Sequence, residues 1–169
     1  MRPEYQREQS EYKEKVVNIS RVTKVVKGGK KMGFRAVVVL GDLKSKVGLG
    51  LGKAAEVSAA IRKGVEAAKR DLMTVPLVSG TIPHDVIGRF SASTVVLRPA
   101  PRGTGVIAGG SVRTILELCG VRNIVAKKIG SSNPINVARA TLEALKLLRS
   151  EEEVSLARGK TLKVSHVET

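Results

Sequence analysis

One segment does most to define the fold of this 169-residue chain: Val47-Gly48-Leu49-Gly50-Leu51-Gly52-Lys53-Ala54. Up to position 52, branched aliphatic residues alternate strictly with glycines, and a period of two is that of a β-strand. The branched side chains therefore share one face of the strand, and the glycines share the other. A face made of glycine permits close approach to the backbone, either by a packed helix or by an RNA backbone.

The residues around this segment predict a small α/β domain of three strands and one helix over residues 15–76. β-branched residues are frequent over 15–26, and apolar residues alternate over 32–40, which indicates two earlier strands. Glycine-containing turns are predicted at Lys27-Gly28-Gly29-Lys30 and at Gly41-Asp42. A helix follows the third strand, because apolar residues recur at three-and-four spacing; they are Val57, Ile61, Gly64, Val65, Ala68 and Leu72.

The remaining residues predict a second small α/β domain over residues 77–150. Strands are expected over 82–90, 94–97 and 124–126, and a helix over 112–119 follows the glycine-rich loop 103–110. Asn133-Pro134 is typical of a helix start. Ser150 and Glu153 predict a capping box for a short last helix, so that residues 151–169 form a short helix and a tail. Residues 1–14 have mixed charge without apolar periodicity and predict a flexible extension. The expected fold class is α+β.

The charge distribution favours a polyanionic partner. The chain has 30 Lys and Arg residues against 15 Asp and Glu, and the segment from Val16 to Lys53 has nine basic residues and one acid. Like charge concentrated on a folded surface repels itself unless a polyanion offsets it. The alternative is a solubilising surface, which explains net charge but not segregation. Aromatic residues make up only 2%, so RNA is expected to bind through phosphates, backbone amides and shape and not through base stacking.

Several classes of function are disfavoured. The chain has a single cysteine, Cys119, which excludes an internal disulfide or a cysteine-cluster metal site. Its longest apolar run is five residues, which is too short for a membrane span. Gly103-x-Gly105-x-x-Ala108 matches a dinucleotide fingerprint but lacks the later acid. Segment 47–54 fails as a phosphate loop, because Val47 and Ala54 replace the required glycine and hydroxyl. With His84-Asp85 adjacent and no nucleophile evident, we expect no enzyme activity, no cofactor and no metal.

The strongest binding candidate is the turn Lys27-Gly28-Gly29-Lys30-Lys31, whose glycines keep the tip thin while three lysines supply charge. The alternative is an ordinary hairpin turn with solvated lysines. Arg21, Lys24 and Arg35 flank the turn and favour RNA.

Several motifs together resemble the bacterial-type family of ribosomal protein five of the small subunit. In the first domain they are Val26 to Lys30, Gly41-Asp42 and the segment 47–54, and in the second they are Gly103 to Gly110 and Gly130 to Asn136. The resemblance extends from about residue 14 to 160. It implies a first domain similar to the double-stranded-RNA-binding fold without its leading helix, and a second, two-layer domain that contains a βαβ unit.

The resemblance also implies a function. The family binds small-subunit ribosomal RNA between the head and the body of the subunit and contacts ribosomal proteins four and eight. It contributes to translational accuracy and lines the mRNA entry path. Its members work in the ribosome, in bacterial cytoplasm or plastid stroma, and not at a membrane. Gly105 and Arg113 match positions at the interface with protein four. A free-standing double-stranded-RNA-binding regulator or RNA chaperone is the alternative. From charge and resemblance together, the predicted RNA-binding residues are Arg21, Thr23, Lys24, Lys27, Gly28, Gly29, Lys30, Lys31, Arg35, Lys53, Lys127, Lys128, Ser131 and Asn133.

Overall fold

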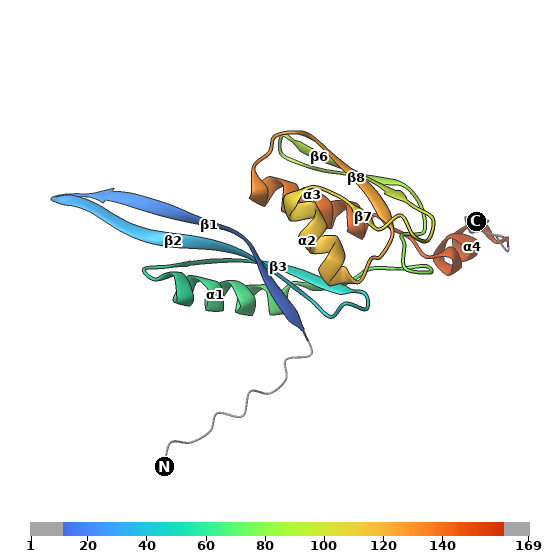
Figure 1. Cartoon of the computed structure of the whole chain (residues 1–169), viewed down its shortest axis with the longest axis horizontal. Coiled ribbons are helices and arrows are strands. Elements are labelled where there is room, and N and C mark those ends of the chain that lie inside the picture. Colours follow the sequence, from blue (N-terminus) through green and yellow to red (C-terminus); the bar gives the residue numbers. More distant parts are fainter. Residues whose placement is uncertain (1–11, 161–169) are drawn as a thin grey trace, which may run out of the picture.

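The computed structural model describes residues 12–160, which form two four-stranded sheets and four helices. The elements stack in four layers (Figure 1): the second sheet, a layer with helices α2 and α3, the first sheet and helix α1. The α+β fold class with two small α/β domains is confirmed. The predicted N-terminal extension lies mostly outside the described residues, as does the tail after Lys160. In the described part of the chain, no helix has the length and apolarity needed to cross a membrane.

The first sheet is antiparallel, with the strand order β1-β2-β3-β4. Its elements are β1 (Lys13–Val26), β2 (Gly29–Gly41), β3 (Lys46–Ala54), α1 (Val57–Arg70) and β4 (Leu72–Thr74). The three predicted strands and the helix are present. The short β4 is additional: Leu72, expected at the end of the helix stripe, instead lies in this strand and pairs with Gly48 of β3.

The glycine face of β3 lies directly against α1. A β-carbon added at Gly50 or Gly52 would collide with the backbone of the helix, at Gly64 and Ala60 respectively. Of the two occupants that the sequence left open for this face, the helix is therefore the correct one. The fully buried residues of α1 are the small ones, Ala60, Gly64 and Ala68. The larger members of the predicted stripe are only half buried, because the close approach leaves no room for them at the centre.

The second sheet has the strand order β5-β6-β8-β7. The elements of this domain are β5 (Val86–Phe90), β6 (Ser93–Pro99), β7 (Val106–Ile107), α2 (Gly110–Cys119), β8 (Ile124–Gly130) and α3 (Pro134–Lys146). β7 is parallel to β8, and α2 connects them, so a βαβ unit is present. The expected strand over 82–90 begins only at Val86; Pro83, which has no amide hydrogen to donate, lies in the segment before it.

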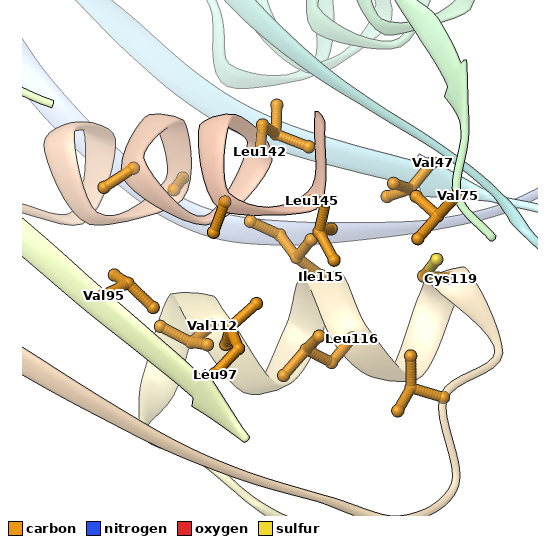
Figure 2. Packing of buried hydrophobic residues seen from close by; sticks show 14 of the residues in the cluster. Val47, Val75, Val95, Leu97, Val112, Ile115, Leu116, Cys119, Leu142 and Leu145 are labelled. Atoms are coloured by element: carbon orange, nitrogen blue, oxygen red, sulfur yellow. The ribbon is translucent and has the colours of Figure 1, made fainter. Parts of the chain in front are cut away.

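One hydrophobic core is shared by the two domains. Val37 and Val39 of β2 belong to the same buried cluster as Ile115 of α2 and Leu145 of α3, whereas Ala36 and Val38, on the opposite face of β2, pack with Ala60 of α1. In Figure 2, Val47 and Val75 of the first domain lie beside Cys119 of α2. The first sheet is therefore covered on both faces, by its own helix and by the second domain.

The last helix, α4 (Glu151–Arg158), has no buried residue. The predicted capping box is confirmed: the Glu153 amide donates to the Ser150 hydroxyl, and the Ser150 amide donates to the Glu153 carboxylate, both at 3.2 Å. The helix ends at Gly159, which has φ of 61°.

Candidate nucleic-acid interface

The tip of the β1–β2 hairpin is thin and exposed. Strand pairing continues to Val26 and Gly29, so that Lys27 and Gly28 alone form the connection. Gly28 and Gly29 have φ of 89° and 151°, values that residues with a side chain rarely adopt. A β-carbon added at either position would meet no atom within 4 Å. The distal hairpin extends beyond β3 and α1 as an arm (Figure 1). We call residues 20–35 the hairpin arm.

The strand register distributes the predicted RNA-binding residues over both faces of the arm. Lys24 lies opposite Lys31, and Arg35 lies opposite Lys53 of β3. Cross-strand partners share a face, and these four share the face of Val37, which is directed toward the second domain. Three other predicted residues in the strands of the arm, Arg21, Thr23 and Lys30, lie on the opposite face. No acidic residue occurs between residues 16 and 41, so each face is uniformly positive.

Arg35 has an unusual environment. Its Nε is buried and has no hydrogen-bond partner in the described residues. It lies between Ser20 and Lys53 across the sheet, and a second cation directly opposite is destabilising unless an anion offsets it. On the other face, the guanidinium of Arg21 is in contact with Met32 Sδ.

Lys127 and Lys128 of β8 are adjacent and therefore point to opposite faces of the second sheet. The Lys128 ammonium donates to the Ser132 hydroxyl at 3.2 Å and lines a hollow of about 320 Å³ between β1 and the first turns of α2 and α3. Neither helix has an acidic residue in its first turn, so the positive ends of the helix dipoles are not neutralised there. Lys127 lies on the outer face instead, away from this hollow.

Ser131 and Asn133 have local structural roles. The Asn133 side chain accepts the Ile135 amide at 3.1 Å and caps α3, as the Asn-Pro pair predicted. The Ser131 hydroxyl accepts the Asn133 amide at 3.3 Å, and the Ser131 carbonyl accepts the Ser93 hydroxyl at 2.9 Å. These contacts hold the loop between β8 and α3 in place.

The loop that contains Gly105 is held by a residue that the sequence analysis did not identify. Asn123, which is buried, accepts the amides of Gly103 and Gly105, both at 3.1 Å. The Ile124 amide in turn donates to the Gly105 carbonyl at 3.0 Å. An Asn directly before a predicted buried strand was the available signal. The loop is therefore ordered, and Gly105 has φ of 74° with no atom within 4 Å of an added β-carbon.

Arg113, the second residue predicted to contact a protein, belongs to an ion-pair cluster between the domains. Its Nε donates to Glu117 at 2.7 Å, and Lys15 of β1 donates to the same carboxylate at 3.3 Å. The hydrogen bond from Arg113, together with the nearby Lys15, holds the pKa of Glu117 below its usual value. Glu117 was also missed by the sequence analysis, and it links α2 to the first sheet.

A further contact between the domains is made by the turn between β2 and β3. The Leu43 amide donates to the Leu118 carbonyl of α2 at 3.0 Å. Asp42 organises the turn, because its Oδ1 accepts the amides of Lys44, Ser45 and Lys46 at 2.8, 2.9 and 2.8 Å.

None of the candidate reactive groups in the described residues is placed for catalysis. Burial raises the pKa of the Cys119 thiol to about 12, which keeps it protonated and inert. His84 Nε2 accepts the Arg149 amide at 3.2 Å, and its Nδ1 lies 2.9 Å from the Asp85 carbonyl, so backbone groups use both ring nitrogens. Within residues 12–160 no three His, Cys, Asp or Glu side chains come together as metal ligands.

The chain is similar to known proteins over most of its length. Residues 12–76 match the family profile described as "Ribosomal protein S5, N-terminal domain", and residues 88–158 match "Ribosomal protein S5, C-terminal domain". Among the similar curated proteins, each named small ribosomal subunit protein uS5, the one from Syntrophobacter fumaroxidans is 60% identical, over 87% of this chain and 89% of the relative. That from Acaryochloris marina is 58% identical, over 89% and 85%, and that from Lawsonia intracellularis is 54% identical, over 92% and 96%. The chain therefore belongs to the bacterial-type ribosomal protein S5 (uS5) family.

Proposed function

We propose that the hairpin arm binds ribosomal RNA and that the protein thereby braces the small subunit. As a member of the S5 family, the protein is a structural, non-enzymatic constituent of the small ribosomal subunit. The proposal adds to this a binding surface, made of the tip and both faces of the arm.

The observation that most supports the proposal is the pairing of like charges across the strands of the arm and between the arm and β3. Lys24 lies directly opposite Lys31, and Arg35 lies opposite Lys53. The β-carbons of such cross-strand pairs are about 5 Å apart, and the charges that their side chains carry repel each other, by up to roughly 1 kcal/mol in water. A stable protein gains nothing from such pairs unless an anion lies against them. A phosphate backbone supplies evenly spaced anions, and the thin tip at Gly28 and Gly29 can approach it closely.

Finer roles follow from the same geometry. A long arm that projects from a rigid body can reach between the head and the body of the subunit, and exposed lysines at its tip can contact mRNA at the entry path. The ordered loop at Gly105 and the exposed face of α2 at Arg113 are proposed to contact neighbouring proteins, for which ribosomal proteins four and eight are the candidates. Through these contacts the protein would contribute to translational accuracy. Lys128, Ser131 and Asn133, beside the hollow at the starts of α2 and α3, are proposed as a second RNA contact.

The arm is tested by removing its charge. We expect a variant with Lys27, Lys30 and Lys31 changed to alanine to bind small-subunit rRNA more weakly, with a salt dependence whose slope is smaller by about 0.7–0.9 for each lost phosphate contact. The matched control changes Lys44, Lys63 and Lys69, which are equally exposed but lie on other elements. Binding is measured by filter retention over a series of salt concentrations. Equal slopes for the two triple variants would mean that net charge, and not the arm, determines binding.

Sedimentation separates this function from that of a free-standing RNA-binding regulator or RNA chaperone. A ribosomal constituent remains with the small subunit in a high-salt gradient, because it is embedded among several contacts. A regulator is released into the soluble fraction. Recovery of the protein in the soluble fraction would contradict the structural role even if the purified chain bound RNA.

A further inference from the structure

Two methionines lie in the described part of the chain, and their environments differ. Met73 of β4 is partly buried and packs against the shared core. Met32 of β2 is 54% exposed and lies in the hairpin arm, beyond Phe34, where the pairing of β2 with β3 ends. The side chain of Met32 is therefore more accessible to small solutes in water than the side chain of Met73.

Met32 belongs to a cationic face of the arm. Its sulfur is in contact with the guanidinium of Arg21, and Thr23 lies directly opposite it across the hairpin. Arg21 forms no salt bridge within residues 12–160, and no acidic residue occurs between residues 16 and 41. A thioether is only a weak hydrogen-bond acceptor. The contact with Met32 therefore leaves the charge of Arg21 available to a phosphate.

Oxidation of the sulfur changes the group that Arg21 meets. A peroxide transfers one oxygen atom to the thioether: an S–O bond forms, the O–O bond breaks, the sulfur loses two electrons, and hydrogen peroxide is reduced to one molecule of water. The product, methionine sulfoxide, is polar and can be reduced again by methionine sulfoxide reductases. Its oxygen carries a partial negative charge and accepts hydrogen bonds far better than a thioether sulfur. A sulfoxide at Met32 can therefore hold the guanidinium that the thioether only contacts.

We propose that Met32 is an oxidation site of the free chain, and that its sulfoxide withdraws Arg21 from rRNA and so weakens the hairpin arm. The oxidant is a peroxide, such as hydrogen peroxide. This inference rests on the proposed function, because the arm has to bind RNA for the change to matter. It adds a reversible control of that binding, which acts on chains that have not yet entered a subunit. In the assembled subunit, RNA against the arm shields the sulfur.

The remaining sulfur groups make the site selective. Cys119 is fully buried, and burial raises the pKa of its thiol to about 12, so there is no thiolate for a peroxide to attack. Met73 is the matched control, because it has the same chemistry in a less exposed position. Met1 lies outside the described residues and is followed separately by its own peptide.

The first measurement is the rate of oxidation at each methionine, determined by peptide mass spectrometry after treatment with dilute hydrogen peroxide. In the purified full chain we expect Met32 to be oxidised about threefold faster than Met73, since susceptibility follows exposure. In purified small subunits we expect Met32 to be oxidised about tenfold more slowly than in the free chain. Equal rates at the two methionines of the free chain would overturn the inference, as would equal rates at Met32 in chain and subunit.

The second measurement is rRNA binding by the full chain before and after oxidation, by filter retention over a series of salt concentrations. We expect oxidation to weaken binding about tenfold and to reduce the salt slope by about 0.7–0.9, which corresponds to one lost phosphate contact. Methionine sulfoxide reductases A and B, which act on the two sulfoxide epimers, should restore both values. Unchanged binding by a chain with Met32 fully oxidised would overturn the inference.

Substitutions separate Met32 from other effects of the peroxide. Met32→Leu keeps the apolar bulk without the sulfur, and we expect its binding to be insensitive to peroxide. Met32→Gln places an amide oxygen near Arg21, and we expect it to bind as weakly as the oxidised wild type without any treatment. Met73→Leu should respond to peroxide as the wild type does. Weaker binding by peroxide-treated Met32→Leu would assign the effect to another residue, and the inference would be wrong.

Failure of the proposed function has a different signature. In that case the arm variant without Lys27, Lys30 and Lys31 binds rRNA as tightly as the wild type does, whatever the oxidation state of Met32. Weaker binding by the arm variant, together with no response to the oxidation of Met32, would refute the oxidation site and leave the function of the arm intact.

Discussion

Gly50 lies where strand β3 and helix α1 come closest. Hydrogen is the only side chain that fits, because a β-carbon there would overlap the backbone of Gly64. The same applies at Gly48 and Gly52, against the backbone of Ala68 and Ala60. The close contact between strand and helix brings their backbones together without large side chains and permits extensive van der Waals contact along both elements.

We therefore expect Gly50→Ala to destabilise the protein by about 3 kcal/mol or more, because neither backbone can move without disturbing the sheet. Urea unfolding followed by circular dichroism measures the effect. Gly109→Ala is the control: Gly109 has φ of −89° and no atom within 4 Å of an added β-carbon, so the expected cost is below about 1 kcal/mol. Equal costs at the two positions would contradict the close packing of β3 against α1.

At the residue scale, the alternation of glycine over 48–52 predicted a face for close approach but not its occupant. The deciding signal was present nearby, because Ala60, Gly64 and Ala68 recur every four residues and form a matching small stripe on the helix. Larger residues at 57, 61 and 65 obscured this stripe, since periodicity alone favours the bulkier face. Asn123 and Glu117 were missed for another reason: Asn123 binds two glycine amides that lie 20 and 18 residues earlier, and Lys15, which links Glu117 to the first sheet, is 102 residues away, so local spacing does not reveal these contacts.

At the element scale, long regular strands were predicted well and short ones were not. β-branched content and alternation identified β1, β2 and β3, because these strands are long enough to display a period. β4 and β7, with three and two residues, exist because a neighbouring strand pairs with them. Adjacent Lys127 and Lys128 appeared as one basic site in the sequence, yet a strand places them on opposite faces.

The turn between β2 and β3 gives a pH-dependent prediction. Partial burial would raise the pKa of Asp42, but the amides of Ser45, Lys44 and Lys46 outweigh this and lower it below its usual value. A lowered pKa in the folded state means that the carboxylate stabilises the protein above the pKa of the unfolded chain, near 4, and that this contribution is lost as the pH falls through the folded value.

We expect Asp42→Asn to be less stable than the wild type at neutral pH by about 1 kcal/mol, because asparagine keeps the acceptor oxygen but not its charge. The difference should shrink below about pH 4 as the wild-type carboxylate is protonated. Thermal unfolding between pH 3 and 7 measures it. Asp85→Asn, at an exposed position before β5, is expected to follow the wild type throughout, and a pH-independent difference for Asp42→Asn would contradict the role of its charge.

At the scale of the whole molecule, the two domains share one core. The sequence predicted two small domains in succession, but it did not indicate how they meet. The contact depends on alternate residues of β2, with Val37 and Val39 facing the second domain and Ala36 and Val38 facing α1. An uninterrupted apolar run over residues 36–40 is typical of a strand covered on both faces, but it does not say which element provides the second cover.

A shared core predicts that the two domains unfold together. Ile115 of α2 is fully buried between the two sheets, and we expect Ile115→Ala to cost about 2–5 kcal/mol. Native-state hydrogen exchange should show the same loss of protection for amides of β2 in the first domain and of β6 in the second, because both depend on the same opening. Leu156→Ala, at a position of α4 that is 86% exposed, is expected to change neither. Loss of protection in β6 with β2 unaffected would mean that the two domains are independent folding units, and that their contact contributes little to the stability of either.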